Sequence, residues 1–254
     1  MKERINLNSD ALQLRRKLGE DPNSPIDIFS LINVLKGITL IFYPMSTNIS
    51  GMCGRIDNTD SYIAINSNHT YGRQRFTLAH ELYHLNFQEK FNRIVCGTDL
   101  EGKKDEEEMN ADTFASFFLA PYESLRIFVF EDLGRAKGQP LGIEDIVKTE
   151  QYFGMSRQAT LYRLKREGFD FQQKTEELKG NVISSARLLG FDDNLYTRSS
   201  IERQFFTTGR YIYLAEKLRE KGIISKGKYE ELLLEAYRPD IVYNLPAEGE
   251  EIYD

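Results

Sequence analysis

The chain has 254 residues, with 33 Lys and Arg against 39 Asp and Glu, a formal net charge of −6, and 41 % hydrophobic residues. This length allows one domain of ordinary size with smaller additions, and the composition excludes a disordered protein. No apolar run approaches the roughly 18 residues that a membrane helix needs, and the first residues lack the apolar core of a secretory signal. Two cysteines far apart in the sequence argue against disulfide staples. We therefore expect a cytoplasmic globular protein, and its mild acidity argues against a protein that coats nucleic acid.

The first third of the chain predicts helices followed by a sheet. One helix is expected to begin at Ser9, and a second to open at Ser24 and end at Gly37. Residues 38–43, 49–56 and 61–66 are then rich in β-formers, and a turn separates the last two. We expect a small antiparallel sheet from these segments, with a hairpin as its later part.

The rest of the chain is predicted to be mainly helical. Residues 72–87 and 106–119 form two longer helices, and a polar, glycine-containing stretch at 134–142 marks a boundary. Residues 143–153 and 156–165 have a helix-turn-helix pattern, and residues 209–221 and 226–237 a helical hairpin. The prediction is an α+β fold in three parts, residues 1–135, 136–170 and 171–254.

The informative motif is His80-Glu81-Leu82-Tyr83-His84 within the helix 72–87. Histidines four residues apart lie on one face of a helix, so both imidazoles can reach one metal ion. Glu81 is placed to bond the water of such an ion but not to be a third ligand from the same turn. With three histidines in the chain, the motif arises by chance in only about 0.002 of such compositions. The plain alternative is a pair of histidines in a core helix.

A catalytic zinc takes three protein ligands and keeps one position open. Glu108 is our candidate for the third ligand, and Asp112, one helical turn later, for a hydrogen bond that orients a ligating histidine. Glu106 and Glu107 are expected on a solvated face but remain alternative ligands. His69 lies too far before His80 along a helix to share an ion. Cys96 is expected to be a small buried side chain, although it could be a soft zinc ligand. Cys53 is expected to be an ordinary strand residue, with a redox role as the alternative.

Several stretches together resemble the ImmA/IrrE family of metallo-endopeptidases. They are Ile63-Ala-Ile-Asn-Ser67, Gly72 to His84, Glu108-Met-Asn-Ala-Asp-Thr-Phe-Ala115 and Leu119-Ala-Pro121. The resemblance covers about residues 25–125; Tyr83 stands where many members have glycine. It implies a minimal, gluzincin-like zincin domain in which Zn²⁺ is held by His80, His84 and Glu108 and in which Glu81 is catalytic. It also implies a protein substrate, a helix-turn-helix repressor whose cleavage switches on mobile-element or stress genes.

The chemistry expected of such a site is hydrolysis of a peptide bond. Zinc makes hydroxide available near neutral pH, Glu81 accepts and returns the proton of the water, and a Tyr or His side chain supplies a further donor to the oxyanion. We expect the substrate to lie extended along an edge of the sheet within residues 49–66. Contacts with residues 136–254 would then select one particular protein.

Two alternative functions remain open. The first is DNA binding through residues 143–168, with Arg157, Arg163, Lys165 and Arg166 on or just after the second helix. It is the less favoured one, because paired short helices more often pack together than read a groove. The second is an antitoxin-like regulatory module in which the zinc is structural or the peptidase is latent. The intact HExxH motif with a separate carboxylate argues against a purely structural zinc, which normally has four protein ligands.

Overall fold

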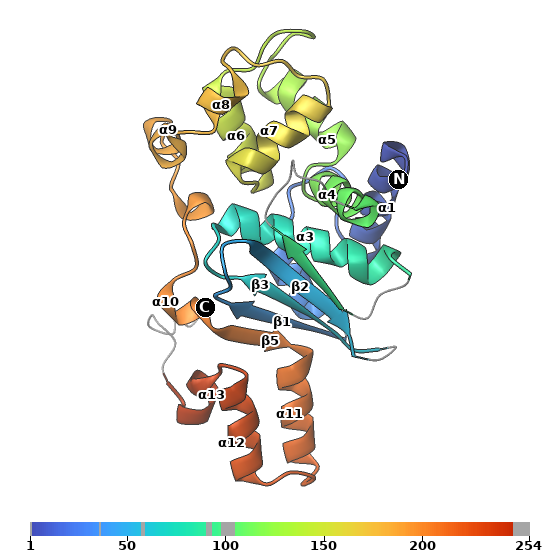
Figure 1. Cartoon of the computed structure of the whole chain (residues 1–254), viewed down its shortest axis with the longest axis vertical. Coiled ribbons are helices and arrows are strands. Elements are labelled where there is room, and N and C mark those ends of the chain that lie inside the picture. The colour runs from blue at the N-terminus through green and yellow to red at the C-terminus, as the bar shows by residue number, and fades with distance from the viewer. Residues whose placement is uncertain (1, 36, 57–58, 90–92, 98–104, 246–254) are drawn as a thin grey trace.

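The computed structural model describes residues 2–35, 37–56, 59–89, 93–97 and 105–245. Its sheet contains β1 (Ile38–Tyr43), β2 (Ile49–Arg55), β3 (Ser61–Asn66), β4 (Arg93–Gly97) and β5 (Phe206–Gly209), in the order β4-β2-β3-β1-β5. Helices lie above the sheet and beyond its β5 edge (Figure 1). The predicted α+β class is confirmed.

The sheet is mixed rather than wholly antiparallel. The predicted hairpin is present as the antiparallel pair β2 and β3, but β1 pairs with β3 in the parallel direction. The chain leaves β1 and passes over one position to reach β2, so that β3 returns into the gap between them. A strand that returns in this way runs parallel to β1, and this part of the antiparallel prediction was wrong.

Two long helices carry the motifs. The helix α3 (Tyr71–Phe87) packs on β2 and β3, and α4 (Glu106–Leu119) packs against α3. Both agree with the predicted ranges to within one residue. Leu78 and Leu82 of the predicted apolar stripe are completely buried, which is worth about 1.5–3 kcal/mol for each side chain.

The two N-terminal helices begin at other residues than predicted. The first, α1 (Arg4–Lys17), starts before Ser9, and its buried face includes Leu7. The second, α2 (Ile28–Val34), is capped by Asp27, which accepts a hydrogen bond from the Ser30 backbone N–H. Ser24 lies too far before Ile28 to cap the helix, and its hydroxyl donates to Asp21 at 2.8 Å.

Two strands were not predicted, and they form the two edges of the sheet. At one edge β4 pairs with β2, and at the other β5 pairs with β1. Both have five residues or fewer, so their sequences carry little period-two signal and tertiary contacts decide their conformation. Gly209 at the end of β5 has φ +88°, and a Cβ there would lie 2.5 Å from the Ile38 carbonyl oxygen.

The predicted helix-turn-helix segment forms two helices, α6 (Ile143–Phe153) and α7 (Arg157–Arg166), joined through Gly154 in the left-handed conformation. Apolar side chains of both helices belong to the same buried core as Leu82 of α3. The division of the chain into three parts stays a prediction, and the core of the first part extends into this segment.

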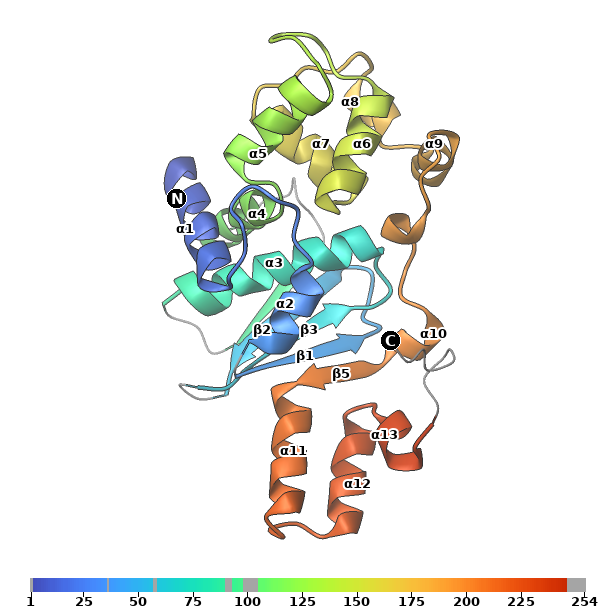
Figure 2. The same ribbon diagram turned by 180° about the vertical axis from the view of Figure 1, so that it is seen from behind.

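Further helices surround this framework. They are α5 (Tyr122–Ile127), the π-helix η1 (Phe128–Asp132), α8 (Thr175–Leu178), α9 (Val182–Leu188), the 3₁₀-helix η2 (Asn194–Tyr196), α10 (Ile201–Gln204), α11 (Arg210–Glu220), α12 (Lys226–Glu235) and α13 (Pro239–Tyr243). The predicted C-terminal hairpin corresponds to α11 and α12, which lie beyond β5 with α13 (Figure 2). None of the helices in the described ranges is both long enough and apolar enough to cross a bilayer.

A buried ion pair ties the helix-turn-helix segment together, and it gives a stability prediction. Arg157 of α7 binds Glu150 of α6 and donates to the Leu178 carbonyl at 2.7 Å and to the Ser185 hydroxyl at 2.8 Å. We expect Arg157→Leu to lower the free energy of unfolding by about 3–5 kcal/mol in urea titrations, because it leaves the Glu150 carboxylate buried and unpaired. Replacing the exposed Lys165 by Ala should change it by less than about 0.5 kcal/mol; equal effects of the two changes would contradict this role.

Candidate metal centre

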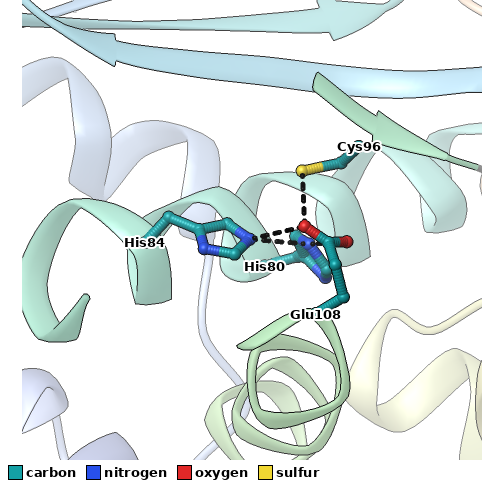
Figure 3. A group of neighbouring side chains, drawn as sticks. All are labelled: His80, His84, Cys96 and Glu108. Carbon is teal, nitrogen blue, oxygen red and sulfur yellow. Dashed lines mark hydrogen bonds and ion pairs between the residues drawn. The ribbon is translucent and has the colours of Figure 1, made fainter. Parts of the chain in front are cut away.

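The helix α3 places two imidazoles side by side. His80 and His84 are one turn apart, are both buried, and bring their Nε2 atoms to 3.1 Å from each other. Both are on the side of α3 that faces α4 (Figure 3). At this distance the lone pairs of the two nitrogens repel each other unless a proton or a cation lies between them.

The third candidate ligand comes from the first turn of α4. The side chain of Asp105 caps this helix by accepting a hydrogen bond from the Glu108 backbone N–H at 2.9 Å. Glu108 then points its carboxylate at the imidazoles, with Oε2 at 3.3 Å from His80 Nε2 and Oε1 at 3.4 Å from His84 Nε2. The structure thus brings together the three side chains that the sequence proposed as ligands.

Outer hydrogen bonds fix how the two imidazoles are presented. His80 Nδ1 is 2.9 Å from Asp112 Oδ1, and His84 Nδ1 is 2.5 Å from Gln88 Oε1. Both oxygens can only accept, so each Nδ1 donates and each Nε2 is directed at Glu108. This arrangement, in which an imidazole donates outward and offers its other nitrogen inward, is the one found around metal ligands.

The charges of the cluster are strongly coupled. Burial alone would favour neutral His80, but hydrogen bonds to Asp112 and Glu108 outweigh it and raise the pKa of His80 to about 10. Burial opposes the charged form of Glu108 as well, yet the two imidazoles hold its pKa far below the usual range. In the metal-free protein a proton therefore occupies the place in which a cation would sit.

Glu81 lies on the sheet side of α3 and is also completely buried. Neither of its carboxylate oxygens has a hydrogen-bond partner of ordinary geometry among the described residues, and the thiols of Cys53 and Cys96 are polar neighbours. Burial raises the pKa of Glu81. A buried carboxylate without a partner is costly, and it is expected where a water molecule or a cation belongs.

The spacing of the donor atoms fits one small divalent cation. Four ligands at about 2.0–2.3 Å from a tetrahedral ion lie about 3.3–3.7 Å from one another. The two Nε2 atoms lie 3.1 Å apart, slightly below this range, and they lie 3.3 and 3.4 Å from the two different oxygens of Glu108. Nitrogen and carboxylate ligands suit Zn²⁺ as well as other transition-metal ions.

The remaining sequence candidates have other places. Glu107 accepts a hydrogen bond from the Tyr83 hydroxyl at 2.8 Å, and Glu106 is exposed. His69 Nε2 lies 3.4 Å from the side-chain nitrogen of Asn66. Cys96 is closer to the site than expected, because its Sγ belongs to the same group of potential ligand atoms as His80, His84 and Glu108, all within 4.8 Å of one another (Figure 3).

Sequence reasoning missed the role of Gln88. It follows His84 by four residues, the same spacing that joins the two histidines, and this spacing is the signal that would have found it. It lies just after the predicted helix 72–87 and was not considered as part of the site.

The predicted docking edge for an extended substrate was wrong. Residues 49–66 form β2 and β3, and both are interior strands of the sheet. The edge nearest the metal centre is β4, which pairs with β2 on one side. The short strand 93–97 gave no sequence signal strong enough to show that it covers β2.

The hydrogen bond from His80 to Asp112 gives a prediction about metal affinity. Replacing Asp112 by Asn removes a charge-assisted acceptor and allows the imidazole to turn, which typically costs 10–100-fold in affinity. We expect a loss of about that size, measured by competition with a chromophoric chelator. An unchanged affinity in the folded variant would show that Asp112 does not orient the ligand.

The raised pKa of His80 predicts how metal affinity depends on pH. The metal-free protein holds a proton at this imidazole up to a pKa of about 10, and binding must displace it. Since one proton competes with one ion, the apparent affinity should rise about tenfold per pH unit from pH 6 to 9. Calorimetry in buffers of different ionisation enthalpy checks this by counting the released protons; an affinity independent of pH would contradict it.

Comparison with known proteins gives one finding. Residues 36–165, just over half of the chain, match the Peptidase_M78 family model, described as the IrrE N-terminal-like domain. The match includes α3 with both histidines, Glu108 on α4, and the helices α6 and α7. No curated protein is similar enough to match. The chain belongs to the Peptidase_M78 family of IrrE N-terminal-like domains.

Proposed function

We propose that this protein is a zinc-dependent endopeptidase with His80, His84 and Glu108 as metal ligands. The observation that carries the proposal is the convergence of two imidazole nitrogens and one carboxylate at tetrahedral spacing, with the unpartnered Glu81 beside them. Membership of a metallopeptidase family supports it.

A zinc ion bound here would polarise the scissile carbonyl and lower the pKa of an attacking water. Glu81 would accept the proton of that water at a carboxylate oxygen and pass it to the leaving amine. Its burial suits this exchange, because it raises the pKa of the carboxyl and makes it a better proton acceptor. Asp112 and Gln88 would hold the imidazoles in place throughout.

Two neighbouring cavities support access of a substrate to this centre. A cavity of about 30 Å³ beside His80, Cys96 and Asp112 offers room for a water molecule. It shares Arg73, Ser156 and Gln158 with an open cleft of about 1170 Å³. The edge strand β4, on which Val95 is 48 % exposed, offers main-chain groups for strand addition.

The substrate that we propose is a helix-turn-helix repressor, whose cleavage would release mobile-element or stress genes. The resemblance to the ImmA/IrrE family supports this choice. Binding to main-chain groups tolerates many sequences, so contacts outside the cleft must select one protein. The helices α8 to α13 provide a surface for them.

Two observations weaken DNA binding as the function. Two of the basic residues that would read a groove, Arg157 and Arg163, are 4 % and 1 % exposed. Arg157 pairs with Glu150, and Arg163 pairs with Glu167 and donates to the Ala120 carbonyl at 3.1 Å. These side chains serve the core rather than a partner.

The test is incubation of the metal-loaded protein with a helix-turn-helix repressor whose gene neighbours its own, as the resemblance implies, read by intact mass. We expect one cleaved peptide bond, no cleavage with chelator or with Glu81→Gln, and recovery when zinc is added back. The Cys96→Ser protein is included because the Cys96 thiol lies 3.7 Å from Glu108 Oε1. A repressor left intact by both the wild type and this variant would contradict the proposal.

A further inference from the structure

Beyond the three ligands already described, β4 brings a sulfur to the same centre. Cys96 Sγ is 3.7 Å from Glu108 Oε1, and the side chain is 2 % exposed. In Figure 3 it points from the sheet toward the Glu108 carboxylate. The two neighbouring positions of β4 alternate, since Val95 faces outward and Cys96 inward.

The register of the sheet explains why this thiol faces the site. Cys96 is paired with Gly51 of β2, and a Cβ at Gly51 would lie 2.6 Å from Thr77 Cγ2 and 3.2 Å from Glu81 Oε1. Paired residues of neighbouring strands project from the same face of a sheet. Cys96 is therefore aimed at the middle of α3, where Glu81 follows His80.

The surroundings of Cys96 are those of a metal ligand rather than of a small core residue. A structural cysteine packs among apolar side chains, whereas Glu81 and Glu108 lie near this thiol. The sulfur lies close enough to share an ion, because Sγ is 3.7 Å from Glu108 Oε1, close to the edge of about 3.5 Å expected for bonds of about 2.0 and 2.3 Å to one tetrahedral ion.

We propose that Cys96 is a fourth protein ligand of the ion and closes the position that a water molecule needs. The inference rests on the proposed metal site of His80, His84 and Glu108. Binding of the sulfur to an ion would require its S–H bond to break, and the neighbouring Glu81 carboxylate would take up that proton. With four protein ligands the ion would lack an open position for a water molecule while the sulfur is bound.

Cobalt(II) tests this directly, because it accepts the same ligands as zinc and shows a near-ultraviolet charge-transfer band only when a thiolate is bound. The matched control is Cys53 on β2, the other cysteine of the chain, which is also completely buried. We expect the band in the wild type and in Cys53→Ser, and its loss in Cys96→Ser with one cobalt still bound. Cys96→Ala serves if the serine variant does not fold.

A hydroxamate tests the closure, because it needs an open position on the ion. If the closed state holds about nine chains in ten, the wild type should bind acetohydroxamate about tenfold more weakly than Cys96→Ser. Equal affinities would contradict closure, and cobalt bound without the band would contradict ligation by Cys96. Neither result bears on the proposed peptidase function. That function would be contradicted if no variant bound cobalt, or if Cys96→Ser left the repressor intact.

Discussion

Replacing Glu81 by Gln is expected to abolish peptide hydrolysis and to stabilise the metal-free protein. Loss of the proton-transferring group should lower the cleavage rate by about 10²–10⁴-fold, while zinc binding is retained. The carboxylate is completely buried and without an ordinary hydrogen-bond partner, so an uncharged amide should raise the free energy of unfolding by about 1–3 kcal/mol at alkaline pH.

The sign of the pH dependence follows from the raised pKa of Glu81. The unfolded chain gives up this proton at lower pH than the folded one, so folding loses stability as pH rises through the folded-state pKa. Chelator-treated wild type and variant should therefore diverge as pH rises in thermal unfolding, and Glu106→Gln on the exposed face serves as the control. A Glu81→Gln protein that cleaves at the wild-type rate, or a variant less stable at pH 9 than the wild type, would refute this role.

Replacing Glu108 by Ala is expected to remove the metal ion. The two imidazoles would remain, but the separate helix that completes the site would contribute nothing. We expect affinity for zinc to fall by more than about 100-fold, beyond the usual effect of losing an outer hydrogen bond, and cleavage to be lost at ordinary zinc concentrations. Competition with a fluorescent chelator measures this.

The matched control is Glu107→Ala, one residue earlier on the same helix. Glu107 accepts a hydrogen bond from the Tyr83 hydroxyl and is not one of the proposed ligands. Its loss should therefore change the affinity for zinc by less than about threefold, which is well under 1.4 kcal/mol. If Glu107→Ala released zinc and Glu108→Ala kept it, the assignment of the third ligand would be reversed.

The sequence allowed the two site helices to be predicted because their signals are local. The spacing of His80 and His84 and the apolar stripe with Leu78 and Leu82 both repeat with the period of one helix. The distance between α3 and α4 could not be predicted from such local patterns, because it depends on packing between segments that are far apart in the chain. The proximity of Glu108 to the histidines was a hypothesis from residue type, and the structure supplies the 3.3 and 3.4 Å separations.

The edges of the sheet could not be predicted for a related reason. β4 and β5 are short, and they become strands because β2 and β1 offer free main-chain groups beside them. Because β4 was not predicted, the docking edge was placed on a strand that β4 covers, and the proximity of Cys96 to the three proposed ligands was not foreseen. A cysteine without a partner motif gives no sequence signal of this position.

The central claim is that one divalent cation is held by His80, His84 and Glu108. Anomalous diffraction at the zinc absorption edge from zinc-soaked crystals tests it most directly. The predicted result is a single strong peak about 2.0–2.2 Å from both Nε2 atoms and from a Glu108 oxygen. A peak bound elsewhere, or full zinc occupancy with Glu108 turned away from the imidazoles, would contradict the account.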